Sequence, residues 1–275
     1  MPDPEPLDAE LIAVGLDTAV VGARITCYGV CDSTNARAWA ADRDGAPDGS
    51  AFLANSQTAG RGRQGRSWLD EPGACLLLSV LLRPPALSPA EAHLLTMLAA
   101  TAAAAAIESA AGLAVELKWP NDLVVGERKL GGILVETSLL GEIVEAAVVG
   151  IGLNVSLDAA SHPQIAESAT SIARELQRPA DRIALARELL RQLDSRYAAL
   201  RAGERAAIFA EWRGRLGTLG RRVEVVGAVP GAVEERRVVL VEDVAPDGAL
   251  VARLEDGSRV EYHFAEVSLR PARGR

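Results

Sequence analysis

The stretch from Gln57 to Trp68 constrains the fold more than any other part of this sequence, because three glycines and three arginines separate two apolar runs there. Gly60, Gly62 and Gly65 form a G-x-G-x-x-G pattern. A dinucleotide-binding fold requires a helix directly after this pattern and an acidic residue about 20 positions further on. Neither requirement is met, because the loop leads into the apolar run 75–82, which is typical of a strand. The pattern therefore does not indicate a Rossmann fold, and the lack of Gly-Lys-Ser/Thr excludes a Walker A loop.

The same loop has the chemistry of an anion site. Arginine presents a fixed, permanently charged fork that matches carboxylate and phosphate groups, and glycine lets the backbone come close to a ligand. The whole chain carries a net charge of −8. A basic loop on an acidic body favours a small anionic ligand over general nucleic-acid binding. The alternative interpretation is a solvated surface loop. Three glycines between arginines favour anion binding over this alternative.

The hydrophobic pattern predicts an α/β domain followed by a small all-β domain. Strands are expected at 25–30, 51–55, 75–82, 115–118, 123–125, 129–136 and 142–150, the last two forming a hairpin. Helices are expected near 8–15, after 33–35, at 88–111 with a capping box at Ser88, after 169–171, at 180–201 and at 204–213. Further strands are expected at 222–229, 236–244, 249–254 and 259–264. We therefore expect a short leader at 1–24, a main domain at 25–216 and a C-terminal domain at 217–275.

Polar residues interrupt the apolar runs at several points. Ser33 or Thr34 could cap the following helix, or their hydroxyls could face a ligand; spacing alone favours the cap. Lys129 begins a buried strand and is soon followed by two glycines, which a strand tolerates best where something approaches its backbone. We therefore expect a ligand beside Lys129. For Lys118 and Asp122 a ligand contact and a surface position remain equally open.

The cysteines, histidines and termini suggest no further chemistry. The chain has three cysteines, three scattered histidines and no basic targeting segment. We expect reduced thiols in a cytoplasmic protein and no protein-built metal site. No apolar run is expected to cross a membrane, since the run at 102–106 is too short.

Taken in order, these motifs resemble those of biotin protein ligases. The matching segments are Ser33-Thr34-Asn35, Gly60-Arg-Gly-Arg-Gln-Gly-Arg66, Lys118-Trp-Pro-Asn-Asp122, Lys129-Leu-Gly-Gly-Ile-Leu134 and Gly150-Ile-Gly-Leu-Asn154, within 25–270. The resemblance implies an α+β fold of the class II synthetase and biotin ligase kind: a mixed sheet flanked by helices in an SH2-like arrangement, followed by an SH3-like β-barrel. Because only residues 1–24 precede this region, it also implies the monofunctional type without a DNA-binding domain.

The resemblance assigns roles to residues. Lys129 and Arg63 would be catalytic. The biotin site would comprise Ser33, Thr34, Asn35, Gln57, Arg61, Gly62, Arg63, Lys129 and Gly132. The ATP or adenylate site would comprise Arg61, Arg63, Arg66, Trp68, Lys118, Asn121 and Asn154. Mg²⁺ is implied as well, with no ligands that the sequence identifies.

The implied activity has two steps, formation of biotinyl-5′-AMP from biotin and ATP, and transfer of biotin to a lysine of a biotin carboxyl carrier domain. The protein would be a cytoplasmic monomer or homodimer without specific DNA binding or membrane contact. One alternative is a lipoate or octanoate ligase-type acyltransferase on the same fold. An alternative from another class is a nucleic-acid- or protein-binding module, which the net charge of −8 and the lack of interleaved aromatic residues disfavour.

Overall fold

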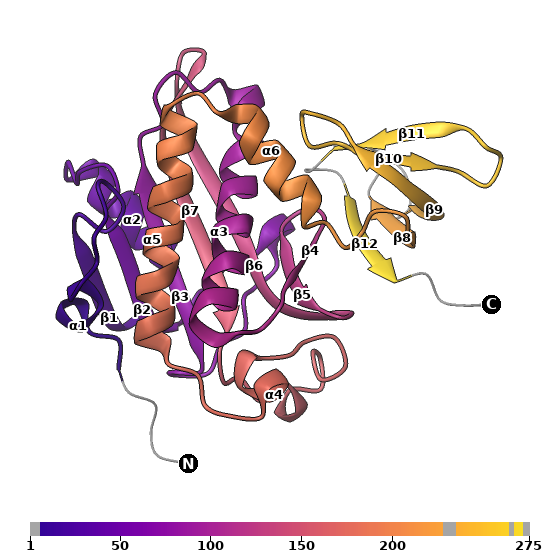
Figure 1. Ribbon diagram of the computed structural model, residues 1–275. Coiled ribbons are helices and arrows are strands. Elements are labelled where there is room, and N and C mark those ends of the chain that lie inside the picture. The colour runs from indigo at the N-terminus through magenta and orange to yellow at the C-terminus, as the bar shows by residue number, and fades with distance from the viewer. Residues whose placement is uncertain (1–5, 228–234, 264–266, 272–275) are drawn as a thin grey trace.

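A seven-stranded mixed sheet forms the centre of the molecule (Figure 1). The computed structural model describes residues 6–227, 235–263 and 267–271. The strand order is β1-β2-β3-β7-β6-β5-β4; β1 and β2 are parallel and the other neighbours are antiparallel. The strands are β1 (Ile25–Cys31), β2 (Ala51–Gln57), β3 (Cys75–Leu82), β4 (Glu116–Lys118), β5 (Asp122–Val125), β6 (Arg128–Leu140) and β7 (Ile143–Asn154). The predicted hairpin between β6 and β7 is confirmed.

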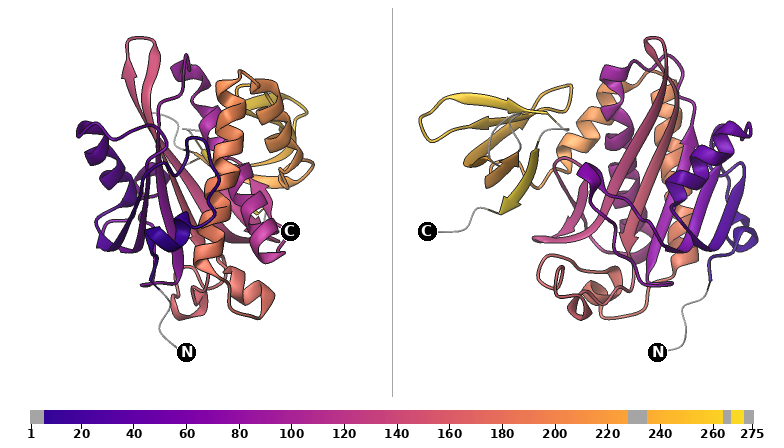
Figure 2. Two further views of the ribbon diagram at one scale, coloured as in Figure 1. Left: turned by 60° about the vertical axis from the view of Figure 1, so that its left-hand side comes forward. Right: turned by 180° about the vertical axis from the view of Figure 1, so that it is seen from behind.

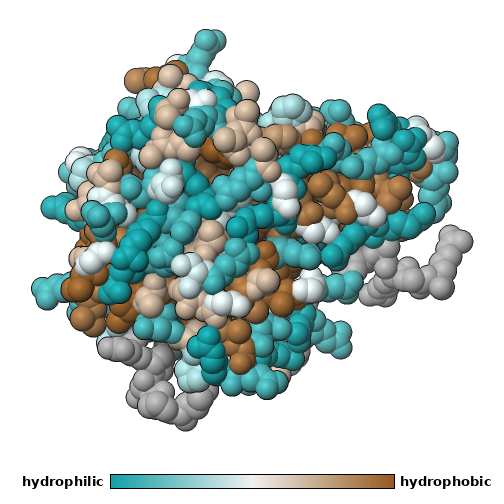
Figure 3. All heavy atoms as spheres, in the orientation of Figure 1, coloured by the Kyte–Doolittle hydropathy of each residue, from teal (hydrophilic) through white to brown (hydrophobic). Residues whose placement is uncertain are grey.

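One face of this sheet is covered by a helical layer. It consists of α3 (His93–Ala111), α5 (Arg182–Arg201) and α6 (Arg205–Gly214), with α3 against the sheet (Figure 2). The predicted capping box at Ser88 and Glu91 begins the segment, and Gly112 ends it in the left-handed conformation (φ 73°). Hydrophilic residues predominate on the outer surface of the layer (Figure 3). The alternating side chains of β3 and β7 supply the core on this side.

The segment Pro89–Ala111 bears on the expectation that no apolar run crosses a membrane. By length and composition it could cross a membrane, which the sequence reading did not anticipate. In the fold, 67% of its most apolar window is buried. Its alanines instead allow close packing on the strands, since a small side chain brings helix and sheet backbones together.

The opposite face of the sheet carries α2 (Thr34–Arg43), which packs on β2, β3 and β7. Ala38 of the helix and Phe52 of β2 belong to the apolar cluster between them. Because strand side chains alternate, every second residue of the central strands faces α2. Ser79 of β3, Gly150 and Gly152 of β7, and Gly132 of β6 occupy such positions, with Gly132 directly opposite Gly152. Small residues at these positions leave space on the sheet beside α2.

The segment predicted as a leader is part of the main fold from residue 6 onward. It contains α1 (Ala9–Ala13), and the side chains of Ile12 and Val21 are fully buried. The Asp194 carboxylate on α5 accepts the backbone N–H groups of residues 19–21 at 2.8–2.9 Å. The domain boundaries at 24/25 and 216/217 remain predictions.

The C-terminal part is a five-stranded antiparallel sheet in the order β11-β10-β9-β8-β12. Its strands are β8 (Arg222–Gly227), β9 (Glu235–Val244), β10 (Leu250–Arg253), β11 (Arg259–Tyr262) and β12 (Val267–Pro271). The expectation of a small β domain is confirmed, although β12 was missed. The predicted strand ends at 228–229 and 264 lie outside the described residues.

Candidate active site

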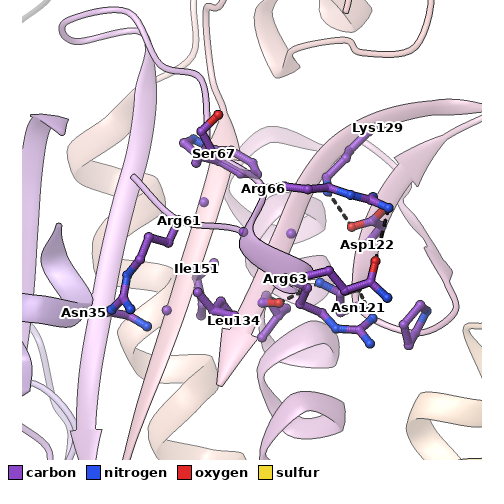
Figure 4. A pocket seen from close by; sticks show the side chains of 18 of the residues that line it. Asn35, Arg61, Arg63, Arg66, Ser67, Asn121, Asp122, Lys129, Leu134 and Ile151 are labelled. Atoms are coloured by element: carbon purple, nitrogen blue, oxygen red, sulfur yellow. Dashed lines mark hydrogen bonds and ion pairs between the residues drawn. The ribbon is translucent and has the colours of Figure 1, made fainter. Parts of the chain in front are cut away.

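A cavity of about 180 Å³ opens beside α2, on the sheet face opposite α3. Residues from α2, the loop after β2, the β4–β5 turn and the central strands line it (Figure 4). The structure brings together most residues predicted for the site: Ser33, Thr34, Asn35, Gln57, Arg61, Gly62, Arg63, Arg66, Trp68, Lys118, Asn121, Lys129 and Gly132. Leu269 of the C-terminal sheet also lines the cavity, so both domains contribute to its wall.

Neutral polar groups form one end of the cavity. Gln57 Oε1 accepts from the backbone N–H of Thr34 (2.7 Å) and from its hydroxyl (3.0 Å). The hydroxyl of Ser79 lies 2.7 Å from Thr34 Oγ1 and 2.6 Å from Asn35 Oδ1. Ser33 occupies the N-cap position of α2, but its side chain makes no capping hydrogen bond. The predicted side-chain hydrogen bond of the helix cap is therefore wrong. The polar side chains of Ser33 and Thr34 face the sheet and the cavity instead.

The sequence did not predict a role for Glu136 of β6 in the site. Its carboxylate accepts from Asn35 Nδ2 (2.8 Å) and Trp39 Nε1 (3.3 Å) and pairs with Arg61 (NH1–Oε1, 3.0 Å). The signal that could have found it is strand alternation, which places residue 136 on the same face as Gly132. Its partners come from distant segments, which no sequence pattern connects.

Two glycines of β7 make room for cavity side chains. A Cβ atom at residue 150 would overlap the Asn35 amide. A Cβ atom at residue 152 would lie 2.8 Å from the Trp68 ring. At both positions the chain's own side chains come close to the strand backbone, which glycine allows.

The other end of the cavity is cationic. Arg63, Arg66, Lys118 and Lys129 line it, against one carboxylate among the described lining residues, that of Asp122, whereas Arg61 lies beside Asn35 at the neutral end (Figure 4). Lys129 Nζ lies 2.6 Å from Asp122 Oδ1 and 5.6 Å from the centre of the Trp68 ring. Arg63 donates to Asn121 Oδ1 at 3.1 Å. Burial lowers the pKa of Lys118, with the nearby Lys129 adding to this effect and Asp122 opposing it. Lys118 and Asp122, left open above, thus both face the cavity.

Asn154 is the exception among the predicted site residues, because it does not line the cavity. Its buried side chain donates to the carbonyl of Thr170 at 3.0 Å and lies 3.7 Å from the Cys75 sulfur. The segment around Thr170 pairs with the backbone of Lys129, which accepts from Thr170 N–H at 2.9 Å and donates to the Ser168 carbonyl at 2.8 Å. Asn154 therefore fixes the segment beside Lys129, and its adenylate contact stays a prediction.

Comparison with known proteins agrees with this site. Residues 28–154 match the biotin/lipoate A/B protein ligase family, and residues 218–270 match the biotin protein ligase C-terminal domain. The bifunctional ligase/repressor BirA of Escherichia coli is 31% identical over 98% of this chain and 81% of its own length. The biotin–[acetyl-CoA-carboxylase] ligase of Mycobacterium tuberculosis is 34% identical over 79% of each chain. The chain spans 60% of the length of the Bacillus subtilis BirA, which is 34% identical over 195 residues.

The fold is also that of solved structures. The biotin protein ligase of Aquifex aeolicus, in complex with biotin and ATP, superposes with a TM-score of 0.76 at 24% identity, covering 91% of this chain and all of the other. The sequence matches cover both the cavity-forming domain and the C-terminal sheet, and the similarity extends over nearly the whole chain. The chain therefore belongs to the biotin protein ligase family.

Proposed function

We propose that this protein activates biotin with ATP to biotinyl-5′-AMP and transfers the biotin to a lysine of a carrier domain. The observation that carries the proposal is the division of one cavity into a neutral polar end at α2, where Arg61 is paired with Glu136, and an end with four cationic side chains. Biotin has a neutral ureido head and a carboxylate tail, and ATP adds a triphosphate. A ligand pair with this distribution of charge matches the cavity.

The neutral end suits the ureido head. Because Gln57 Oε1 is already occupied by Thr34, the Gln57 amide nitrogen remains to donate into the cavity. The Ser33 hydroxyl is not used as a helix cap and faces the same space. Leaving such a buried polar group unpaired costs about 1–3 kcal/mol, which a hydrogen-bonding ligand would recover.

In the first step a biotin carboxylate oxygen bonds to the α-phosphorus of ATP, and the bond from that phosphorus to the bridging oxygen of pyrophosphate breaks. Two anions must meet, and their repulsion costs several kcal/mol at an intermediate dielectric. Lys129, Arg61 and Arg63 offset this repulsion and stabilise charge on the transferring phosphoryl group. Arg66, Trp68, Lys118 and Asn121 complete the nucleotide side.

Magnesium would enter with ATP. Among the described residues no cluster of three acidic, histidine or cysteine ligands exists, and the Asp122 carboxylate is paired with Lys129. Among the described residues that line the cavity, Asp122 is the single acidic side chain and would be the one to contact the ion. This composition fits Mg²⁺ held mainly by phosphate oxygens and water.

In the second step the ε-amine of an acceptor lysine attacks the biotinyl carbonyl carbon, AMP leaves with the bridging oxygen, and the amine loses a proton. Biotinyl-AMP hydrolyses when water reaches it, so the loop at 60–67 must cover it until the acceptor arrives. The names of the Mycobacterium and Paracoccus relatives support a carrier domain of acetyl-CoA carboxylase as the acceptor.

A lipoate or octanoate acyltransferase is the second candidate, because the matching family includes lipoate ligases. The match of residues 218–270 to the biotin ligase C-terminal domain favours biotin. An octanoyltransferase with a cysteine nucleophile is disfavoured, because burial raises the pKa of Cys27 and Cys31 to about 11 and that of Cys75 to about 12. The free thiols also support placing the reaction in the cytoplasm.

The deciding experiment incubates the protein with Mg-ATP, a biotin carrier domain and either biotin or lipoate, followed by intact-mass measurement of the carrier. We expect one added biotin and no added lipoate. A carrier whose acceptor lysine is replaced by arginine is the control and should stay unmodified. Lipoylation without biotinylation would refute the proposal.

A further inference from the structure

We propose that Glu136 is a positioning residue that couples the neutral end of the cavity to the arginine loop through one carboxylate. The inference rests on the proposed function and adds a residue to it. Glu136 does not itself line the cavity. It lies behind two residues that do, Asn35 and Arg61, and contacts both.

The carboxylate joins three elements that are distant in sequence. Asn35 and Trp39 reach it from α2, Arg61 reaches it from the loop after β2, and Glu136 itself belongs to β6. Arg61 uses both terminal nitrogens, NH1 to Oε1 at 3.0 Å and NH2 to Oε2 at 3.1 Å. Such a two-point contact fixes the orientation of the guanidinium as well as its distance.

The same carboxylate sets the orientation of the Asn35 amide. Asn35 Nδ2 donates to Glu136 at 2.8 Å, while its Oδ1 lies 2.6 Å from the hydroxyl of Ser79. The amide therefore cannot reverse without placing its oxygen against the carboxylate. Glu136 thus fixes the orientation of the Asn35 amide and the place at which Arg61 is held.

The loop has a second anchor at the cationic end, where Arg63 donates to Asn121 Oδ1. Figure 4 shows Arg61 beside Asn35 at one end and Arg63 beside Asn121 at the other. The Arg61–Glu136 pair is thus the anchor at the end proposed for biotin, and Arg63–Asn121 is the one at the nucleotide end. Loss of the first should affect biotin and retention of the adenylate more than ATP.

The Arg61–Glu136 pair is open to salt, because 48% of the Arg61 side chain and 26% of the Glu136 side chain are exposed. Partly exposed ion pairs change an equilibrium about twofold to fivefold, and added salt weakens them. The salt dependence of adenylate escape therefore separates an effect of the Glu136 charge from an effect of its side-chain volume.

The test uses Glu136→Gln, which keeps the length and an acceptor oxygen for Asn35 and Trp39 but removes the charge. We expect about two- to fivefold faster escape of biotinyl-AMP, measured as labelling of bystander lysines, and a similar increase in the KM for biotin. The KM for ATP should remain unchanged. Escape from the unaltered protein should increase with salt, whereas escape from the variant should not. Glu145→Gln is the matched control, because Glu145 is an exposed carboxylate on the adjacent strand β7, and it should behave as the unaltered protein.

A double-mutant cycle tests the coupling directly. Arg61→Gln removes the same pair from the loop side, so Glu136→Gln should add nothing to adenylate escape in that background. The proposal would be overturned if Glu136→Gln increased adenylate escape as much in the Arg61→Gln background as in the unaltered protein. It would also be overturned if Glu136→Gln alone left adenylate escape and the KM for biotin unchanged, or if escape from this variant kept its full salt dependence. Thermal unfolding of each variant checks the fold. If the unaltered protein forms no biotinyl-AMP, it is the proposed function that fails.

Discussion

At the residue scale, Lys129 is the cation of the cavity whose position the chain fixes most firmly. Its ammonium is paired with Asp122 at 2.6 Å and lies 5.6 Å from the Trp68 ring, yet 39% of the side chain is exposed. Its backbone is fixed by hydrogen bonds to Ser168 and Thr170. The ammonium can therefore meet an incoming anion without a large rearrangement of the strand.

We expect Lys129→Ala to reduce biotin-dependent ATP–pyrophosphate exchange by at least about 100-fold, since one preorganised charge contributes that much in a site where charge develops. The fold should persist, because the side chain is partly exposed and its backbone bonds do not depend on it. Exchange assays and circular dichroism measure the two effects. Near-normal exchange in a folded variant would remove Lys129 from the mechanism.

At this scale the sequence predicted residues that carry their own local signal. The Gly/Arg loop and Lys129 stand out by residue type and spacing, and the structure places them at one cavity. Glu136 and Ser79 were missed because their partners in α2 lie far away in the sequence. Asn154 carries a recognisable motif, but its side-chain direction is set by Thr170 and Cys75, which the motif does not contain.

At the scale of the elements, β7 shapes the cavity through its glycines. We expect Gly152→Ala to displace the Trp68 ring, because the new Cβ would lie 2.8 Å from it, and overpacking of this kind costs about 1–3 kcal/mol. The melting temperature should decrease and the KM for ATP should increase. Gly29→Ala on β1 is the control, since nothing lies within 4 Å of its Cβ position. Equal melting temperatures for the two variants would contradict this account.

The loop between β2 and β3 should respond to ligands as one unit. Its ends are joined by backbone hydrogen bonds from Trp68 to Gly60 and from Gly62 to Arg66, while Arg61 and Arg63 contact other elements through their side chains. We expect trypsin cleavage at Arg61, Arg63 and Arg66 to slow at least severalfold when biotin and ATP are present together. Equal cleavage rates with and without ligands would argue against closure of the loop.

Sequence patterns predicted elements best where periodicity or a cap was strong, as at α3 and the β6–β7 hairpin. They failed at β12, a short strand near the end of the chain. This strand is defined by its pairing with β8, a long-range contact without a local pattern.

At the scale of the whole molecule, Trp119 joins the two domains. Its indole N–H donates to the carbonyl of Gly248 in the β9–β10 turn at 2.9 Å, and its backbone N–H donates to the Thr218 hydroxyl at 3.2 Å. The ring is 1% exposed. Its neighbours Lys118, Pro120 and Asn121 line the cavity, so the C-terminal sheet supports the wall proposed for the nucleotide.

We therefore expect Trp119→Phe to act on ATP more than on biotin. The variant loses the indole donor and leaves the buried Gly248 carbonyl unpaired, which should lower the free energy of unfolding by about 1–3 kcal/mol. The KM for ATP should increase severalfold while the KM for biotin changes little, because Ser33, Asn35 and Gln57 lie on the other side of the cavity. Denaturant unfolding and steady-state kinetics measure both. If Trp119→Phe raised both KM values equally, support from the C-terminal sheet would not be specific to the nucleotide wall.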